Sequence, residues 1–182
     1  MCWKSLNPCQ LSLSKLVRAE IDPVDVPSNV IDNVEFLCMN HTEMDTFKSI
    51  SMFRNLIHIK LQFNSIFRGW DGVVELLQNC PRLEILFIKK WFLSLSRDWK
   101  CPSLALECVL SHLRSCTILN FQCYGNDLRF ATYILQNARR LQDMTINITT
   151  YPSNWMLLGK RQIIEGLSSY PKIQLNLLYN LL

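Results

Sequence analysis

The stretch Leu77-Gln78-Asn79-Cys80-Pro81-Arg82-Leu83 returns 58 residues later as Leu135-Gln136-Asn137-Ala138-Arg139-Arg140-Leu141, with five of seven positions identical. An apolar, helix-like segment precedes each copy, and alternating apolar residues follow it, as expected for a half-buried strand. A looser third copy begins at Leu167 and runs into the alternating residues after Ile173. The sequence therefore predicts a repeated unit made of a short helix, a tight corner and a strand.

The strand half of this unit occurs more often than the helix half. Leu56-x-x-Ile59-x-Leu61-x-x-Asn64-x-Ile66 fits the leucine-rich-repeat template L-x-x-L-x-L-x-x-N-x-L at every fixed position when Ile is read as Leu. In that template the apolar side chains point into the core, and the Asn can satisfy backbone groups at the bend. With weaker copies included, strands are expected to start near residues 16, 34, 56, 83, 116, 141 and 173.

The spacing between these strand starts indicates a fold class. Successive spacings run from 18 to 33 residues and centre on the length of leucine-rich repeats, although they are irregular. We therefore expect an α/β fold, a leucine-rich-repeat-like right-handed solenoid of about seven irregular rungs, each rung being one strand with its connection. The alternative is a compact α/β layer fold in which these similarities are accidental.

Composition and charge exclude several classes of protein. The chain has 182 residues, 49% of them hydrophobic and 19% charged, which argues against a disordered segment. A net charge of +4, a pI of 8.6 and only 5 Gly argue against a dedicated nucleic-acid binder or a phosphate-binding loop. Residues 1–30 lack a signal-peptide pattern, and no apolar run reaches the roughly 18 residues that span a bilayer. We expect an intracellular protein of the cytoplasm or nucleus, not secreted, with no nucleic-acid or membrane partner.

The eight cysteines raise the question of a metal site. No C-x-x-C pair is present, and an intracellular chain keeps its thiols reduced. Cys108, His112 and Cys116 are spaced four residues apart, so on one helix they would share a face and could bind a metal with a fourth ligand. The same spacing fits a buried apolar stripe, which we favour because Cys is commonly a core residue. We expect no metal and no cofactor.

The sequence contains no motif of a known catalytic site. His41, His58 and His112 have no nucleophile or carboxylate partner at a motif spacing. The patterns G-x-S-x-G, H-E-x-x-H and G-x-x-x-x-G-K-[ST] do not occur. We therefore expect a binding protein without catalytic residues rather than an enzyme, since solenoids commonly act through an extended surface.

A candidate binding surface follows from the two-residue period of the strands, because residues between the core positions face the concave side. Lys60 and Lys89 are expected beside an exposed Phe87, and an exposed aromatic near cations is typical of a peptide-binding hot spot. Ile85, Ile118 and Asp143 are expected on the same face. The candidate partner-binding residues are His58, Lys60, Gln62, Phe87, Lys89, Asn120, Gln122, Thr145 and Asn147.

The C-terminal half resembles a known family. Cys101-Pro102, residues 107–113 (ECVLSHL), Tyr124-Gly125 and residues 133–144 (YILQNARRLQDM) are similar in order and spacing to the plant FBD domain, which closes the leucine-rich repeats of many plant F-box proteins. The resemblance implies an irregular repeat region over residues 1–100 and an FBD-like domain over residues 101–182 that continues the solenoid. The family usually has several acidic residues before the YIL helix, and here only Asp127 is present.

The resemblance also implies a function. The chain is similar to the substrate-recognition part of an F-box/leucine-rich-repeat/FBD subunit of a ubiquitin ligase, a protein-interaction module whose protein substrate is unidentified. Residues 1–30 contain no F-box pattern, so binding to a Skp1-type adaptor is expected only if a missing F-box is restored. Two alternatives stay open: a small-anion or hormone co-receptor that uses Lys60, Lys89 and Lys90 as a basic pocket, or a truncated gene product without an independent function.

Overall fold

A computed structural model describes residues 17–21, 33–40, 52–63, 69–90, 99–121, 125–150, 165–171 and 173–179. These residues form an α/β fold built on one seven-stranded sheet. Asn64 and Ile66 of the repeat template, and the candidate residue Gln122, lie outside the described residues. The α/β class predicted from the apolar alternation is confirmed.

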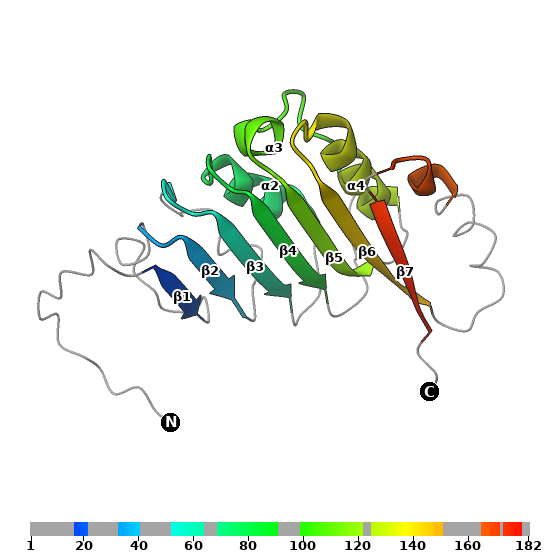
Figure 1. The fold of residues 1–182 in the computed structure, drawn as a ribbon, viewed down its shortest axis with the longest axis horizontal. Helices are drawn as coiled ribbons and strands as arrows, with labels where there is room; N and C mark the ends of the chain where they lie inside the picture. The colour runs from blue at the N-terminus through cyan, green and yellow to red at the C-terminus, as the bar shows by residue number, and fades with distance from the viewer. Residues whose placement is uncertain are drawn as a thin grey trace, which may run out of the picture.

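The strands follow one another across the sheet in the order in which they occur in the sequence (Figure 1). Every neighbouring pair is parallel, so each connection must return the chain to the same end of the sheet. The bounds of the strands are β1 (Arg18–Ile21), β2 (Phe36–Met39), β3 (His58–Phe63), β4 (Ile85–Lys90), β5 (Ser115–Phe121), β6 (Asp143–Thr150) and β7 (Ile173–Tyr179).

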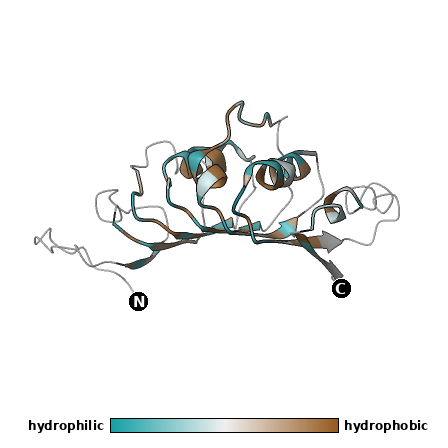
Figure 2. Ribbon diagram, turned by 45° about the horizontal axis from the view of Figure 1, so that its top comes forward, coloured by the Kyte–Doolittle hydropathy of each residue, from teal (hydrophilic) through white to brown (hydrophobic). Residues whose placement is uncertain are grey.

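Three helices, α2 (Asp71–Gln78), α3 (Glu107–Ser111) and α4 (Gly125–Asn137), lie on one face of this sheet (Figure 2). Strand residues that point toward the helices, such as Leu61 and Ile88, are fully buried in a single apolar core. Alternate residues of β3 are only half-buried, as the period of two requires. We call the face of the sheet turned away from α2, α3 and α4 the outer face.

The repeated seven-residue stretch has the same hydrogen bond at each helix end. The side-chain amide nitrogen of Asn79 donates to the carbonyl of Glu75 at 3.1 Å, at the end of α2. The side-chain amide nitrogen of Asn137 donates to the carbonyl of Tyr133 at 2.8 Å, at the end of α4. Each bond gives a carbonyl near the helix end a side-chain donor, where the backbone donors of the helix run out.

The corner after each helix is also the same. The amide nitrogen of Leu83 donates to the carbonyl of Cys80 at 3.2 Å, and that of Leu141 donates to the carbonyl of Ala138 at 3.2 Å. All four side chains are buried. The sequence repeat is therefore a structural repeat of a helix end and a corner that leads into a strand.

The predicted side-chain orientation of β5 is partly wrong. The pattern Cys116-x-x-Leu119-x-Phe121 assigned all three residues to the core and Ile118 to the exposed face. Instead, Ile118 is fully buried, whereas Leu119 is half-buried. The reason is that the motif starts three residues earlier, at buried Leu113, so Cys116 and Ile118 pair in register with buried Leu86 and Ile88. An irregularity in the pairing with β6 follows between Ile118 and Phe121, where Asn120 has a φ of 60°. An inserted residue shifts the alternation by one, so Phe121 returns to the core.

Candidate interaction surface

The parallel register aligns the outer-face positions of neighbouring strands into rows that cross the sheet. The first row consists of Arg18, Phe36, His58, Ile85, Ser115 and Asp143. The second row consists of Glu20, Cys38, Lys60, Phe87, Thr117, Thr145 and Gln174. Gln62, Lys89 and Leu119 form a third, shorter row.

These rows contain most of the residues predicted for the exposed face. His58, Lys60, Gln62, Phe87, Lys89, Thr145 and Asn147 all occupy half-buried strand positions that alternate with buried ones. Asn120 differs, because it sits at the irregularity of β5, where its side-chain amide donates to the carbonyl of Lys90. The prediction that Ile118 shares this face is wrong.

Sequence reasoning did not assign eight residues of these rows to the exposed face: Arg18, Glu20, Phe36, Cys38, Ser115, Thr117, Leu119 and Gln174. Arg18 and Phe36 belong to the strands with the weakest repeat copies, so no exposed positions were assigned there. Their signal was present in the alternation of β1, where exposed Arg18 and Glu20 flank buried Ala19. Leu119 was assigned to the core because the repeat template was started at Cys116, whereas the pairing with β4 places its start at Leu113.

The first row begins with a stack of a cation and two rings. The Arg18 guanidinium carbon lies 3.9 Å from the centroid of the Phe36 ring. The Phe36 ring meets the His58 ring edge-on, with centroids 4.6 Å apart and an interplanar angle of 74°. Burial, followed by the charges of Arg18 and Lys60, lowers the pKa of His58, so this imidazole is neutral at neutral pH.

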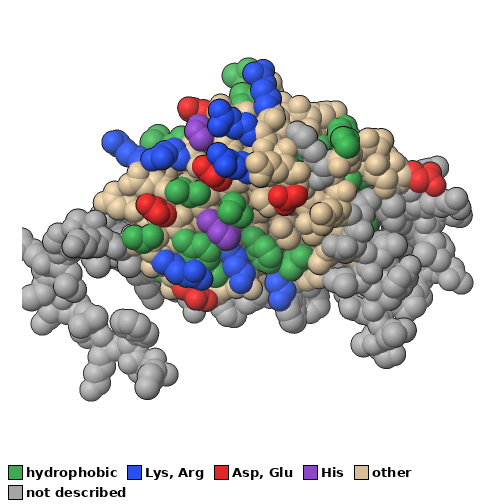
Figure 3. Space-filling model, viewed as in Figure 1, with side chains coloured by type: hydrophobic (Ala, Val, Ile, Leu, Met, Phe, Trp, Pro, Cys, Tyr) green, Lys and Arg blue, Asp and Glu red, His purple; other side chains and the backbone are tan. Residues whose placement is uncertain are grey.

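The second and third rows place amino groups beside apolar side chains. The Lys60 ammonium nitrogen lies 5.4 Å from the centroid of Phe87 on the next strand, within cation–π range. Lys89 pairs in register with Leu119. Figure 3 shows this face, where blue Lys and Arg side chains gather close to green hydrophobic ones.

Charge on the outer face divides between the two halves of the sheet. On β1 to β4 the charged positions of the rows are Arg18, Lys60, Lys89 and the single carboxylate Glu20. On β5 and β6 the charged position is Asp143, whose carboxylate accepts a hydrogen bond of 2.7 Å from the Ser115 hydroxyl. The first half is therefore basic and apolar, and the second is hydroxyl-rich with one acid.

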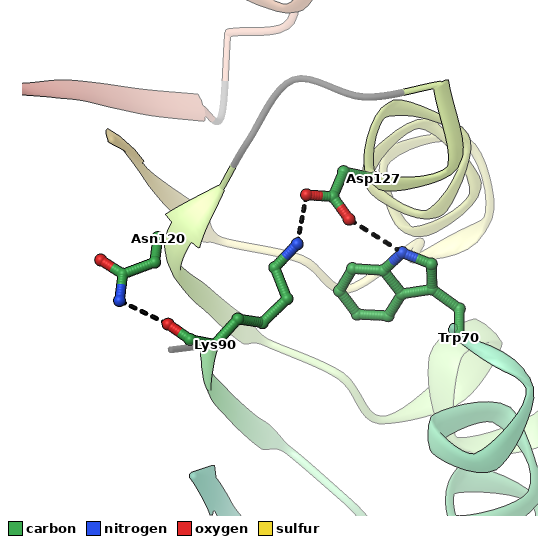
Figure 4. Close-up of polar contacts among 4 residues, drawn as sticks. All are labelled: Trp70, Lys90, Asn120 and Asp127. Atoms are coloured by element: carbon green, nitrogen blue, oxygen red, sulfur yellow. Dashed lines mark hydrogen bonds and ion pairs between the residues drawn. The ribbon is translucent and has the colours of Figure 1, made fainter. Parts of the chain in front are cut away.

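Lys90 does not belong to this surface, so the alternative of a basic pocket made of Lys60, Lys89 and Lys90 is corrected for its third lysine. As the last residue of β4 it points toward the helices and is fully buried. Its ammonium pairs with the carboxylate of Asp127 on α4, and the other oxygen of Asp127 accepts a hydrogen bond of 3.1 Å from the Trp70 indole (Figure 4). Asp127, the one acid retained before the YIL helix, is therefore a buried structural residue.

Aromatic rings surround this buried pair. The Trp70 ring stacks on Phe130 of α4 with centroids 3.9 Å apart and planes 6° apart. The Lys90 nitrogen lies 5.3 Å from the centroid of Trp70 and 5.9 Å from that of Phe121. The cluster joins α4, β4, β5 and the start of α2, so it fixes the helix layer on the sheet.

One side of α4 also holds the segment from Trp99 to Leu106. The side-chain oxygen of Asn126 accepts a bond of 3.1 Å from the Trp99 amide, and Arg129 donates to the Trp99 carbonyl at 3.0 Å. The Tyr133 hydroxyl accepts a bond of 2.9 Å from the amide of Leu106, the residue before α3. These three residues are three and four apart, so they lie on one side of the helix.

Comparison with known proteins assigns this region to a family. Residues 101–146 match the family model described as FBD. The chain is related to the plant F-box/FBD/LRR-repeat proteins. One such protein of Arabidopsis thaliana is 27% identical over 86% of this chain and 38% of its own length, and another is 30% identical over 63% and 26%. A putative FBD-associated F-box protein of the same plant is 27% identical over 54% of this chain and 25% of its own length.

The chain therefore spans less than two-fifths of the length of these relatives. No solved structure matches it. The FBD match begins at the segment held by α4 and includes α3, β5 and α4. The basic, apolar half of the outer face on β1 to β4 lies before it, so that half belongs to the region that precedes the FBD match.

Four of the five described cysteines of this FBD relative, Cys38, Cys80, Cys108 and Cys116, are buried, and Cys101 is exposed. α3 ends at Ser111, and Cys116 lies in β5. Cys108, His112 and Cys116 therefore do not share one helix face, contrary to the metal-site alternative raised from their spacing. Burial raises the pKa of Cys108 and of Cys116 to about 12, which disfavours the thiolate that binds metals. Within the described ranges, no three His, Cys, Asp or Glu side chains are grouped closely enough to hold a metal.

A shallow groove of about 460 Å³ runs between residues 101–105 and α4, with Cys101, Arg129 and Tyr133 among its lining residues. Burial raises the pKa of Tyr133, so its hydroxyl stays protonated near neutral pH. Among the described helices, none is long and apolar enough to cross a membrane. The described part of the FBD relative thus offers an extended face with half-buried aromatic rings and cationic side chains, and a small groove beside α4.

Proposed function

We propose that the chain is a protein-interaction module that presents the outer face of its sheet to a protein partner, as the substrate-recognition part of an F-box/LRR/FBD subunit of a ubiquitin ligase would. The observation that supports this role is the set of aromatic and cationic side chains in regular rows on the outer face, centred on Phe87. The relatives' names include an F-box and leucine-rich repeats, which agrees with a role in protein binding.

The proposal also covers the architecture of the module and its division into regions. The strands and their connections form a leucine-rich-repeat-like solenoid of about seven rungs, with an irregular repeat region over residues 1–100 and an FBD domain over residues 101–182. The module acts in the cytoplasm or nucleus and by binding rather than by catalysis. The sequential parallel order of the seven strands supports this arrangement.

The test compares two variants that each remove one apolar side chain. Tagged wild-type chain, Phe87→Ala and Leu104→Ala are expressed in plant cells, and the co-purifying proteins are measured by quantitative mass spectrometry. Leu104 is the control because it is 81% exposed in the segment before α3, away from the outer face. We expect partners to be lost with Phe87→Ala and retained with Leu104→Ala. A partner set that survives Phe87→Ala unchanged would contradict the proposal.

A second test concerns the ligase itself. Since residues 1–30 contain no F-box pattern, we expect the purified chain not to bind a purified Skp1-type adaptor directly. Fusion of an F-box to its N-terminus should confer adaptor binding. Direct binding by the unfused chain would contradict the role as a recognition part alone.

A further inference from the structure

We propose that the outer face over β2, β3 and β4 binds an acidic peptide segment of the partner, with an aliphatic or aromatic side chain of that segment seated on Ile85 and Phe87. This inference rests on the proposed function and names the chemistry of its partner. It is carried by the separation of charge on the outer face and by the apolar patch on β4, at the edge of the basic half.

The apolar patch is made by side chains on adjacent strands. Ile85 is 36% exposed and Phe87 is half-buried two residues along the same strand, so both project from the outer face of β4. Leu119 extends the patch onto β5, where it pairs in register with Lys89. A partly exposed aromatic ring beside aliphatic side chains on a rigid sheet is a suitable anchor point for one apolar residue of a peptide.

Cationic groups border this patch on the β3 side and at its end. Lys60 lies in register with Phe87 and holds its ammonium 5.4 Å from the ring centroid. Lys89 follows Phe87 by two residues on the same face of β4. Glu20, the carboxylate of this half, lies three strands from Phe87 and accepts a hydrogen bond of 3.0 Å from Asn40.

The neighbouring ion pair does not change the net positive charge of this half of the outer face. Arg114 and Glu84, which precede β5 and β4, lie 3.3 Å apart and carry opposite charges. The lowered pKa of His58, caused by burial and then by Arg18 and Lys60, reflects the same excess of positive charge. Complementary charge favours an acidic partner and disfavours a basic one, even though each exposed contact is weak.

A twelve-residue random peptide library displayed on phage, selected against the full chain, tests this inference. We expect the enriched peptides to combine Asp or Glu with Phe, Leu, Ile or Trp. Lys60→Glu/Lys89→Glu should weaken the binding of an enriched peptide by about tenfold or more, and added salt should weaken it further. The double variant Lys60→Gln/Lys89→Gln should bind the peptide with an affinity between that of Lys60→Glu/Lys89→Glu and that of the wild type.

The matched control is Arg139→Glu/Arg140→Glu, which changes the net charge by the same amount. Arg139 and Arg140 are exposed at the corner between α4 and β6, and neither belongs to the outer-face rows. We expect this control to bind the peptide within about twofold of the wild type, because charges beyond a Debye length are screened. Circular dichroism of each variant establishes that the fold is retained.

The outcomes separate this inference from the proposed function. Enriched peptides that depend on Phe87 but lack acidic residues would overturn the acidic class and leave the interaction role intact. Enriched peptides insensitive to both Phe87→Ala and Lys60→Glu/Lys89→Glu would overturn both. Failure to enrich any peptide, or binding of a single-stranded RNA oligonucleotide that Lys60→Glu/Lys89→Glu abolishes, would overturn the acidic-peptide inference, and the co-purification experiment would then decide the proposed function.

Discussion

At the scale of single residues, the ammonium of Lys90 and the carboxylate of Asp127 are both removed from water. Their exposed fractions are 0% and 1%, so each charge depends on its partner rather than on solvent. The Trp70 indole gives the carboxylate a further donor, and aromatic faces surround the ammonium. A buried pair of this kind contributes little net stability, but the loss of one partner leaves a buried, uncompensated charge.

Asp127→Asn is therefore expected to be strongly destabilising. The free energy of unfolding should fall by about 3–5 kcal/mol, because the Lys90 ammonium loses its counter-charge in the core. Urea denaturation followed by circular dichroism measures this change. A loss below about 1 kcal/mol, the range of exposed ion pairs, would contradict the role of the pair.

The double variant Lys90→Met/Asp127→Asn keeps this test informative if Asp127→Asn does not fold. Removal of both charges leaves no uncompensated ion, so the double variant should be more stable than Asp127→Asn alone. If the double variant lost as much free energy of unfolding as the two single variants lose together, charge coupling between the residues would be contradicted.

At the scale of elements, α2 and α4 end in the same way although their sequences differ over most of their lengths. Asn79 and Asn137 each satisfy a carbonyl of the last turn, and the next four residues form the same corner. The repeat therefore encodes the exit from the helix and the entry into the strand, and the rest of each helix is selected by what it packs against.

Asn79→Ala and Asn137→Ala should each lower the free energy of unfolding by about 1 kcal/mol, the net value of one hydrogen bond. The two effects should be similar in size, because the bonds occupy equivalent positions. Urea denaturation of both single variants tests this. A large effect at one site with none at the other would show that the two helix ends are not equivalent.

Tyr133→Phe should loosen the segment before α3. The change removes the hydroxyl that accepts the Leu106 amide bond but keeps the ring in the core, so a loss of about 1 kcal/mol is expected. Hydrogen exchange at the Leu106 amide should accelerate more than exchange in β3. Equal acceleration at both places would indicate a global loss of stability instead of a local one.

The elements also show which features could be predicted from the sequence. Apolar alternation is a local property, so it located the strands and placed His58, Lys60 and Phe87 on the exposed side. The template L-x-x-L-x-L fits β5 whether it starts at Leu113 or at Cys116, and only the pairing with β4 decides between the two, so Ile118 was misplaced. Lys90 and Asp127 are 37 residues apart, and a lysine in a mildly basic sequence gives no local sign of burial.

At the scale of the whole molecule, one core joins the strands and helices, and several cysteines lie within it. Cys80, Cys108 and Cys116 are at most 1% exposed, and burial raises the pKa of each thiol above its ordinary value. In the unfolded chain these thiols ionise near the ordinary pKa, so the unfolded state releases protons at lower pH than the folded state.

The free energy of unfolding should therefore fall as the pH rises above about 9, by about 1.4 kcal/mol per pH unit for each such thiol, and for Cys108 and Cys116 this fall ends as their folded-state pKa of about 12 is approached. Urea denaturation between pH 8 and pH 11 measures this slope. Cys116→Ala should reduce the slope, whereas Cys101→Ala should not, because Cys101 is exposed. An unchanged slope in Cys116→Ala would contradict the assignment.

The strand order has a consequence for how molecules of this kind can change in evolution. Each strand pairs with the strands next to it in the sequence, so gene duplication or deletion of one unit leaves the pairing of the others intact. Each added strand widens the sheet by about 4.8 Å. Related genes can therefore acquire wider or narrower recognition surfaces by changing their number of units, without redesign of the core that each unit shares with its neighbours.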